Sequence, residues 1–130
     1  MVAVCAFLGA APAQAGQFYL CEMKTKYPNG WVSPSVGLIF DDAGGVQVID
    51  GIIHNFIGEP VKASLRKRGD KFRITWHLSN LRDSLGQVLP KMRYLAEFDN
   101  ETKEVTVAAR PVGPPQRWSA KGTCKIRTSR

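Results

Sequence analysis

The residues that could do chemistry in this chain are few, and their spacing fits neither a metal site nor a catalytic group. His54 and His77 are the only histidines, and no His-x-His or His-x-x-x-His pair offers the spacing that holds zinc. His77 falls on the polar side of an alternating segment, where a solvated histidine is expected. His54 stands among apolar residues, where a partly buried, hydrogen-bonded histidine is expected. The sequence therefore predicts no bound metal.

The carboxylates and hydroxyls give no catalytic motif either. Glu22, Asp50, Glu59 and Glu97 do not form a recognisable acid pair, and no Gly-x-Ser-x-Gly segment is present. The glycine pairs have the context of turns and not of a phosphate-binding loop. We predict a protein that is not an enzyme and takes no cofactor.

Residues 1–15 have the composition of a secretion signal. They are uncharged, apolar through Leu8, and end in Ala13-Gln14-Ala15, the small residues that a signal peptidase accepts. We predict cleavage near Ala15 and export to the periplasm or the medium, which leaves residues 16–130 as a single domain. No segment approaches the roughly 20 apolar residues of a transmembrane helix.

The cysteines fit export. Removal of residues 1–15 takes away Cys5 and leaves Cys21 and Cys124, near the two ends of the domain. An even pair in an exported chain most often forms a disulfide. We predict this bridge, which by the chain-entropy argument stabilises the fold by roughly 4–5 kcal/mol.

Apolar and polar residues alternate with a period of two through much of the chain. The clearest runs cover residues 71–78, 92–98, 105–110 and 118–127, and the last places Cys124 on its apolar face. Clean alternation with one wet face is typical of an antiparallel sheet. Turn residues at 28–30, 41–45, 68–70 and 99–102 separate the runs. We predict an all-β fold, a small antiparallel up-and-down barrel of about eight strands closed by the disulfide, with a two-sheet β-sandwich as the alternative. Residues 51–58 fit either a helical turn or an irregular strand.

Basic residues outnumber acidic ones, with a net charge of +7 and a pI near 9.6. Such a surface attracts anionic partners. For an exported protein we expect an anionic cell-envelope component and not nucleic acid; a charged surface that only keeps the protein in solution is the alternative. The candidate residues of this surface are Arg66, Arg68, Lys71, Arg73, Lys121 and Lys125.

The large aromatic residues suggest a second kind of site. If the barrel is hollow, inward-facing Trp76, Tyr94, Phe98 and Trp118 line a cavity for a small apolar ligand. If the barrel is filled, the same four side chains form its core.

The layout resembles small periplasmic β-barrel proteins of Gram-negative bacteria that have no assigned function. The resemblance is carried by a cysteine in the first strand, by Gly122-Thr123-Cys124 in the last, and by residues 48–53 and 76–83. It implies a lipocalin-like architecture and no particular activity. The sequence thus favours a non-catalytic binding module for a small apolar ligand or an anionic envelope component. The alternative is a protein-partner domain, such as a periplasmic inhibitor or an envelope assembly factor.

Overall fold

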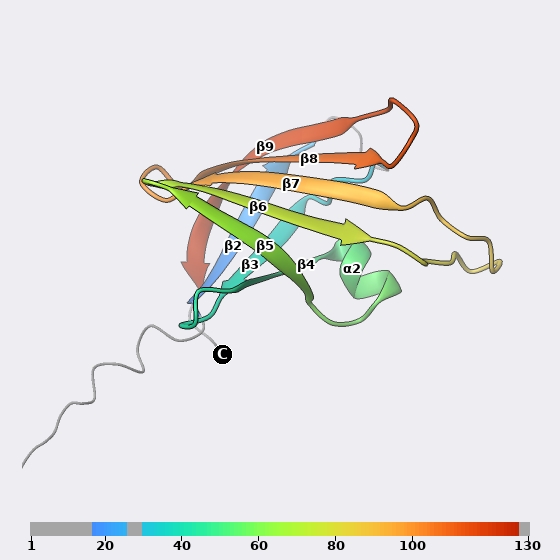
Figure 1. The fold of residues 1–130 in the computed structure, drawn as a ribbon, viewed down its shortest axis with the longest axis horizontal. Coiled ribbons are helices and arrows are strands. Elements are labelled where there is room, and N and C mark those ends of the chain that lie inside the picture. Colours follow the sequence, from blue (N-terminus) through green and yellow to red (C-terminus); the bar gives the residue numbers. More distant parts are fainter. Residues whose placement is uncertain (1–16, 26–29, 128–130) are drawn as a thin grey trace, which may run out of the picture.

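The computed structural model describes residues 17–25 and 30–127 (Figure 1). The predicted secretion signal lies outside the described residues, as do two of the three positions of the turn predicted at 28–30.

The described chain folds into one closed antiparallel barrel of eight strands, each paired with the next in the sequence. The last strand pairs with the first, from Phe18 opposite Arg127 to Lys24 opposite Lys121, so the sheet has no free edge. This confirms the predicted barrel and excludes the sandwich. The strands are β2 (Gln17–Lys24), β3 (Ser35–Phe40), β4 (Val46–Asp50), β5 (Val61–Arg68), β6 (Lys71–Leu78), β7 (Met92–Asp99), β8 (Glu104–Pro111) and β9 (Trp118–Arg127).

The alternation seen in the sequence decides which side chains point inward. On β6, Ile74, Trp76 and Leu78 are buried while Arg73 and His77 are exposed. Strands β7 and β8 follow the same rule, so the barrel encloses one apolar core. Burial of these side chains supplies most of the free energy that holds the strands together.

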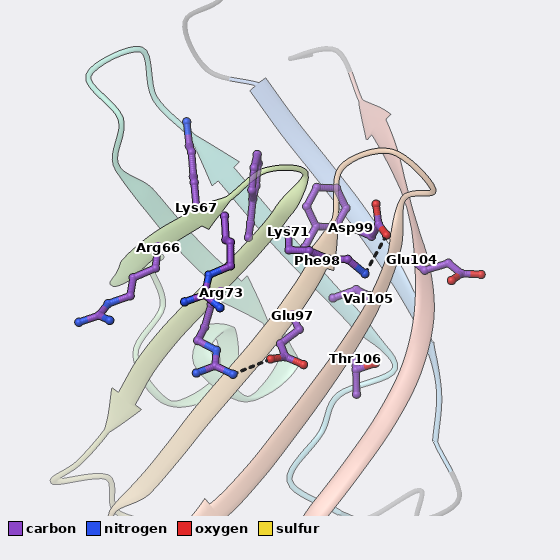
Figure 2. Close-up of a pocket in the computed structure, with 12 residues that line it drawn as sticks. Arg66, Lys67, Lys71, Arg73, Glu97, Phe98, Asp99, Glu104, Val105 and Thr106 are labelled. Atoms are coloured by element: carbon purple, nitrogen blue, oxygen red, sulfur yellow. Dashed lines mark hydrogen bonds and ion pairs between the residues drawn. The ribbon is translucent and has the colours of Figure 1, made fainter.

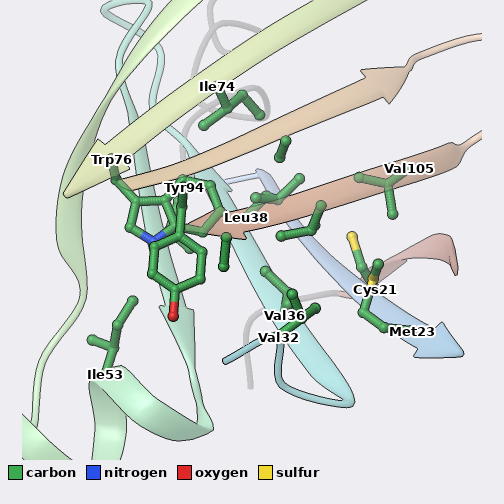
Figure 3. Close-up of a cluster of buried hydrophobic side chains, with 14 of the residues drawn as sticks. Cys21, Met23, Val32, Val36, Leu38, Ile53, Ile74, Trp76, Tyr94 and Val105 are labelled. Atoms are coloured by element: carbon green, nitrogen blue, oxygen red, sulfur yellow. The ribbon is translucent and has the colours of Figure 1, made fainter. Parts of the chain in front are cut away.

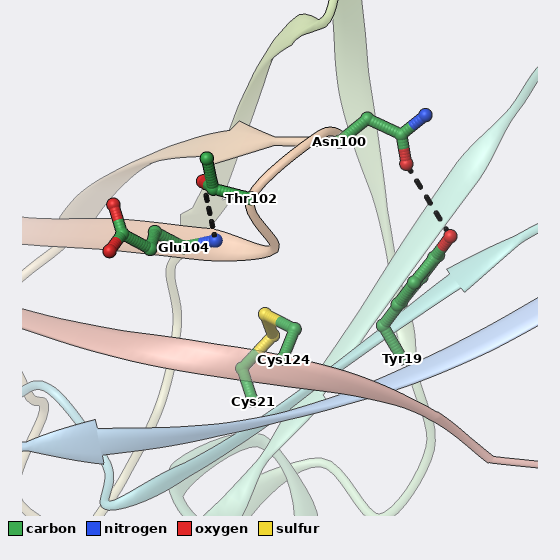
Figure 4. The surroundings of a disulfide bond; sticks show 6 residues. All are labelled: Tyr19, Cys21, Asn100, Thr102, Glu104 and Cys124. Carbon is green, nitrogen blue, oxygen red and sulfur yellow. Dashed lines mark hydrogen bonds between the residues drawn. A yellow bond between two sulfur atoms is a disulfide. The ribbon is translucent and has the colours of Figure 1, made fainter.

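The seam between β2 and β9 carries the disulfide (Figure 4). Cys21 and Cys124 lie directly opposite each other, with an S–S distance of 2.01 Å and buried side chains. Gly122 keeps the two strands close, because a Cβ at this position would collide with the backbone carbonyl of Glu22. The predicted bridge is therefore part of the closure of the barrel.

The ambiguous segment after β4 forms a short helix, α2 (Gly51–Phe56). Asp50 caps the N-terminus of α2 by accepting a 2.8 Å hydrogen bond from the Ile53 amide. Just beyond the other end of the helix lies Gly58, whose φ is +90°. Ile53 is fully buried under the barrel, whereas His54 points outward and is exposed. The expectation of a partly buried His54 was wrong, because the helical turn places His54 on the outer side of α2.

The two ends of the barrel differ. At one end, called here the closed end, α2 covers the core between β4 and β5, and the connections 79–91 and 112–117 extend beyond the strands (Figure 1). At the other end, called here the mouth, only the short turns at 41–45, 69–70 and 100–103 join the strands. Among the described residues, no helix has the length and apolarity to cross a membrane.

Candidate functional site

The predicted basic residues of the β5–β6 hairpin come together around one surface hollow. Arg66, Arg68, Lys71 and Arg73 line this hollow, which has a volume of about 690 Å³ (Figure 2). Lys121 lies one strand further round, opposite Thr106 of the same hollow. Lys125 is on the far half of β9 and is not part of the hollow.

Acidic residues offset much of the charge around that hollow. Lys71 is paired with Asp99 at 3.2 Å and Arg73 with Glu97 at 2.8 Å. Asp99 also accepts hydrogen bonds from the amides of Glu101 and Thr102, and these bonds together with Lys71 lower its pKa. The hairpin therefore offers less free positive charge than its sequence indicates.

The neighbouring outer face of β6, β7 and β8 differs in the charge of the residues that line it. A groove of about 360 Å³ runs across it and is lined by four arginines: Arg73, Arg93, Arg110 and Arg117. Its other lining residues are uncharged, namely Thr75, Leu95 and Ala108. We call this feature the arginine groove.

Two of these arginines lie directly opposite each other. Arg93 of β7 and Arg110 of β8 are register partners on the exposed side of the barrel. Among the described residues neither forms an ion pair, and the one polar side-chain partner of Arg93 is His77, whose Nε2 accepts from the Arg93 Nε at 3.5 Å. Like charges directly opposite on a sheet destabilise it, and an anion bound between them would remove that cost.

Sequence reasoning missed Arg93, Arg110 and Arg117 as site residues. The alternation in 105–110 does place Arg110 outside, but the pattern of one strand does not reveal which residue of the next strand lies beside it. Arg117 precedes β9 in a connection and has no periodic signal at all.

The four residues proposed to line a cavity lie in the barrel interior. Trp76 and Tyr94 stack with nearly parallel rings, centroids 5.1 Å apart, above Ile53 of α2 (Figure 3). Phe98 is fully buried and Trp118 packs against the same core at partial exposure. Trp76 and Tyr94 therefore pack against each other inside the barrel, whereas Phe98 packs against the rings of Tyr19, Phe40 and Phe72.

Polar groups at the closed end of this core are unevenly satisfied. The Tyr94 hydroxyl donates to the Trp31 carbonyl at 2.7 Å, and burial raises the pKa of that hydroxyl. The Trp76 Nε1 is buried with no hydrogen-bond partner among the described residues. Burial also raises the pKa of Asp50, although the amides of Ile53 and Ile52 oppose the shift. All three groups are internal. Asp50 caps the N-terminus of α2, and Tyr94 and Trp76 form the ring stack above that helix.

The histidines and carboxylates do not gather. Within the described part of the chain, no three His, Cys, Asp or Glu side chains are grouped so that they could hold a metal ion. His54 and His77 are both exposed and lie on different elements.

Large apolar side chains are exposed mainly at the closed end. Leu85 and Val88 in the 79–91 connection are 82% and 62% exposed, and Val112 is 55% exposed. Val112 is tied to this connection, because its amide donates to the Lys91 carbonyl at 2.9 Å.

No known protein family, curated protein or solved structure matches this chain. The functional argument therefore rests on the fold and on the geometry of its surface.

Proposed function

We propose that this protein is a non-catalytic exported binding module whose arginine groove takes the phosphate group of an anionic cell-envelope component. The observation that carries the proposal is the register pair Arg93–Arg110, two exposed arginines at opposite positions of β7 and β8 with no carboxylate paired to either in the described chain. Such a pair costs roughly 0.2–1 kcal/mol in the absence of an anion.

The chemistry of the groove favours phosphate. A guanidinium presents its N–H donors in a planar fork that matches two oxygens of one phosphate. Arg117 lines the same groove and adds a further donor, whereas the guanidinium of Arg73 is already paired with Glu97 at 2.8 Å. Leu95 and Ala108 form an apolar floor between them, which lowers the competition from water.

The location of the protein decides which phosphates it meets. The Cys21–Cys124 bridge is compatible with an oxidising compartment, and the composition of residues 1–15 predicts export. In such a compartment the abundant phosphates belong to envelope lipids and lipopolysaccharide and not to nucleic acid.

The test measures co-sedimentation of the oxidised protein with vesicles of phosphatidylglycerol and phosphatidylcholine, and with pure phosphatidylcholine, at low and high salt. We expect salt-sensitive binding to the anionic vesicles only. The variant Arg93→Gln/Arg110→Gln removes two charges worth about 1 kcal/mol each at an anionic surface, so binding should weaken about thirtyfold.

The matched control is Lys125→Gln/Arg127→Gln, which removes the same charge from the end of β9 furthest from Arg117. It should weaken binding by about threefold or less, because its long-range contribution is screened. Equal losses in the two double variants would show that net charge alone attracts the vesicles and would refute the groove. If the protein bound inorganic phosphate but no vesicles, the arginine groove would stand as a phosphate site, and the proposal that its ligand is an envelope component would be refuted.

A further inference from the structure

The mouth of the barrel holds a further pocket that shares Lys67 and Phe72 with the hollow of the β5–β6 hairpin and no lining residue with the arginine groove. It has a volume of about 300 Å³, and Tyr19, Phe40, Leu65, Phe72, Lys67 and Lys103 are among the residues that line it. The register pair of the groove, Arg93 and Arg110, lies toward the closed end, at the start of β7 and the end of β8, whereas Arg73 lies at the start of β6, nearer the mouth.

The floor of the mouth pocket is a cluster of aromatic rings. Phe40 lies 5.7 Å from Tyr19 and 5.8 Å from Phe72, measured between ring centroids, and fully buried Phe98 lies beneath at 5.1 Å from Tyr19 and 5.9 Å from Phe72. Phe40 and Phe72 are only half-buried, so parts of these rings remain open to the pocket. A concave site with aromatic walls is typical of pockets that bind small apolar groups.

Lys67 occupies a position where the strand pattern calls for an apolar residue. On β5 the inward positions before it are Val61, Ala63 and Leu65. Lys67 is the register partner of Phe72, and its Nζ lies 5.4 Å from the centroid of that ring. Among the described residues its ammonium makes no ion pair. Lys67 thus takes an inward register position at the rim of the mouth, where it is exposed, lies over an aromatic ring and has no paired carboxylate among the described residues, so it is open to an anion.

Lys103 brings a second ammonium group to the same pocket. Its Nζ lies 5.5 Å from the ring centroid of Tyr19 and 6.0 Å from that of Phe98, and it donates to the Asn100 Oδ1 at 3.0 Å. The φ angle of Lys103 is +66°, a conformation that non-glycine residues rarely adopt.

One carboxylate also lines the pocket, that of Asp41. Its Oδ1 accepts the amides of Ala43 and Gly45 at 3.0 and 2.8 Å within the β3–β4 turn. Asp41 is thus engaged by its own turn, and the two lysines leave the pocket with an excess of positive charge.

We propose that the mouth pocket binds a small anionic amphiphile, a short- or medium-chain carboxylate whose chain lies on the rings of Phe40 and Phe72 and whose anionic group meets Lys67 and Lys103. The volume of the pocket is at the lower end for ligand sites, which sets the limit on chain length. Charge complementarity, and not the apolar surface alone, selects this class of ligand.

The experiment titrates the oxidised protein with octanoate and with its neutral amide, octanamide, by isothermal titration calorimetry. We expect octanoate to bind at least tenfold more tightly, and its methylene protons to give NOEs to the rings of Tyr19 and Phe72. Lys67→Gln should weaken octanoate binding about tenfold and Lys67→Arg by less than threefold, because arginine restores the charge. The matched control is Lys62→Gln, on the exposed outer side of the same strand, which should have no effect.

Equal affinity for the acid and the amide would overturn the role of the lysines, and no binding of either at millimolar concentration would overturn the pocket. Equal weakening by Lys67→Gln and Lys62→Gln would also refute it. The Arg93→Gln/Arg110→Gln variant should bind octanoate as the wild type does, so the failure of this proposal and failure of the arginine groove are distinguishable.

Discussion

Reduction of the Cys21–Cys124 disulfide should remove about a third or more of the stability of this domain. The two cysteines are 103 residues apart in the sequence, so the bridge closes nearly the whole described chain into one loop. The chain-entropy relation gives about 4.7 kcal/mol for a loop of about 100 residues, against a typical total of about 5–15 kcal/mol for a domain. The bridge acts on the unfolded state, because the reduced unfolded chain has more conformational entropy than the bridged one.

The measurement is urea unfolding at 25 °C, followed by circular dichroism, for the oxidised protein, the reduced protein and Cys21→Ala/Cys124→Ala. Denaturant slopes for small domains are about 1–3 kcal/mol per molar urea, so the midpoint of the reduced protein should fall by roughly 1.5–5 M. The double alanine variant should lose slightly more, because it also removes two buried sulfur atoms.

The reduced protein should still fold, because the β2–β9 pairing from Phe18 to Lys24 does not depend on the bridge. A loss below about 1.5 kcal/mol, with an unchanged slope, would refute the entropic reasoning and show that the unfolded chain already keeps its ends together.

Three further changes test the packing. Gly122→Ala should destabilise the fold by about 2 kcal/mol or more in urea unfolding, because the new methyl group meets the Glu22 backbone; a neutral result would contradict the close approach of β2 and β9. Because burial raises the pKa of Asp50, the contribution of this group to the free energy of unfolding should fall as pH rises from the ordinary aspartate value of 3.8 through the folded-state pKa. Asp50→Asn keeps the helix cap and lacks this dependence, so its stability relative to wild type should increase between pH 4 and pH 7, and the opposite trend would be incompatible with a raised pKa. Tyr94→Phe leaves the Trp31 carbonyl without its 2.7 Å donor and should cost about 1 kcal/mol, seen as a drop of about 4 °C in thermal midpoint; an unchanged midpoint would mean that water replaces the hydroxyl.

Local pattern in the sequence was enough to predict most of the barrel wall. The period-two runs at 71–78 and 92–98 became β6 and β7, and the inward position of Cys124 followed from the alternation of the last strand. These predictions succeed because the two faces of a strand are set by the pleat, which is a property of a few consecutive residues. The helix at 51–56 was left open because its decisive signal, the cap by Asp50, depends on how β4 ends.

The sites depended on the tertiary structure. Arg93 and Arg110 are 17 positions apart in the chain and become neighbours only through the β7–β8 register. Phe40 at the end of β3, Phe72 at the start of β6 and Lys103 in the β7–β8 turn meet only when the strands pair round the closed barrel. From its sequence alone, this protein is predictably an alternating, disulfide-closed β-domain with a basic surface. Register and closure decided where the charge and the aromatic rings gather, because both arise from pairing between distant segments, which no local pattern encodes.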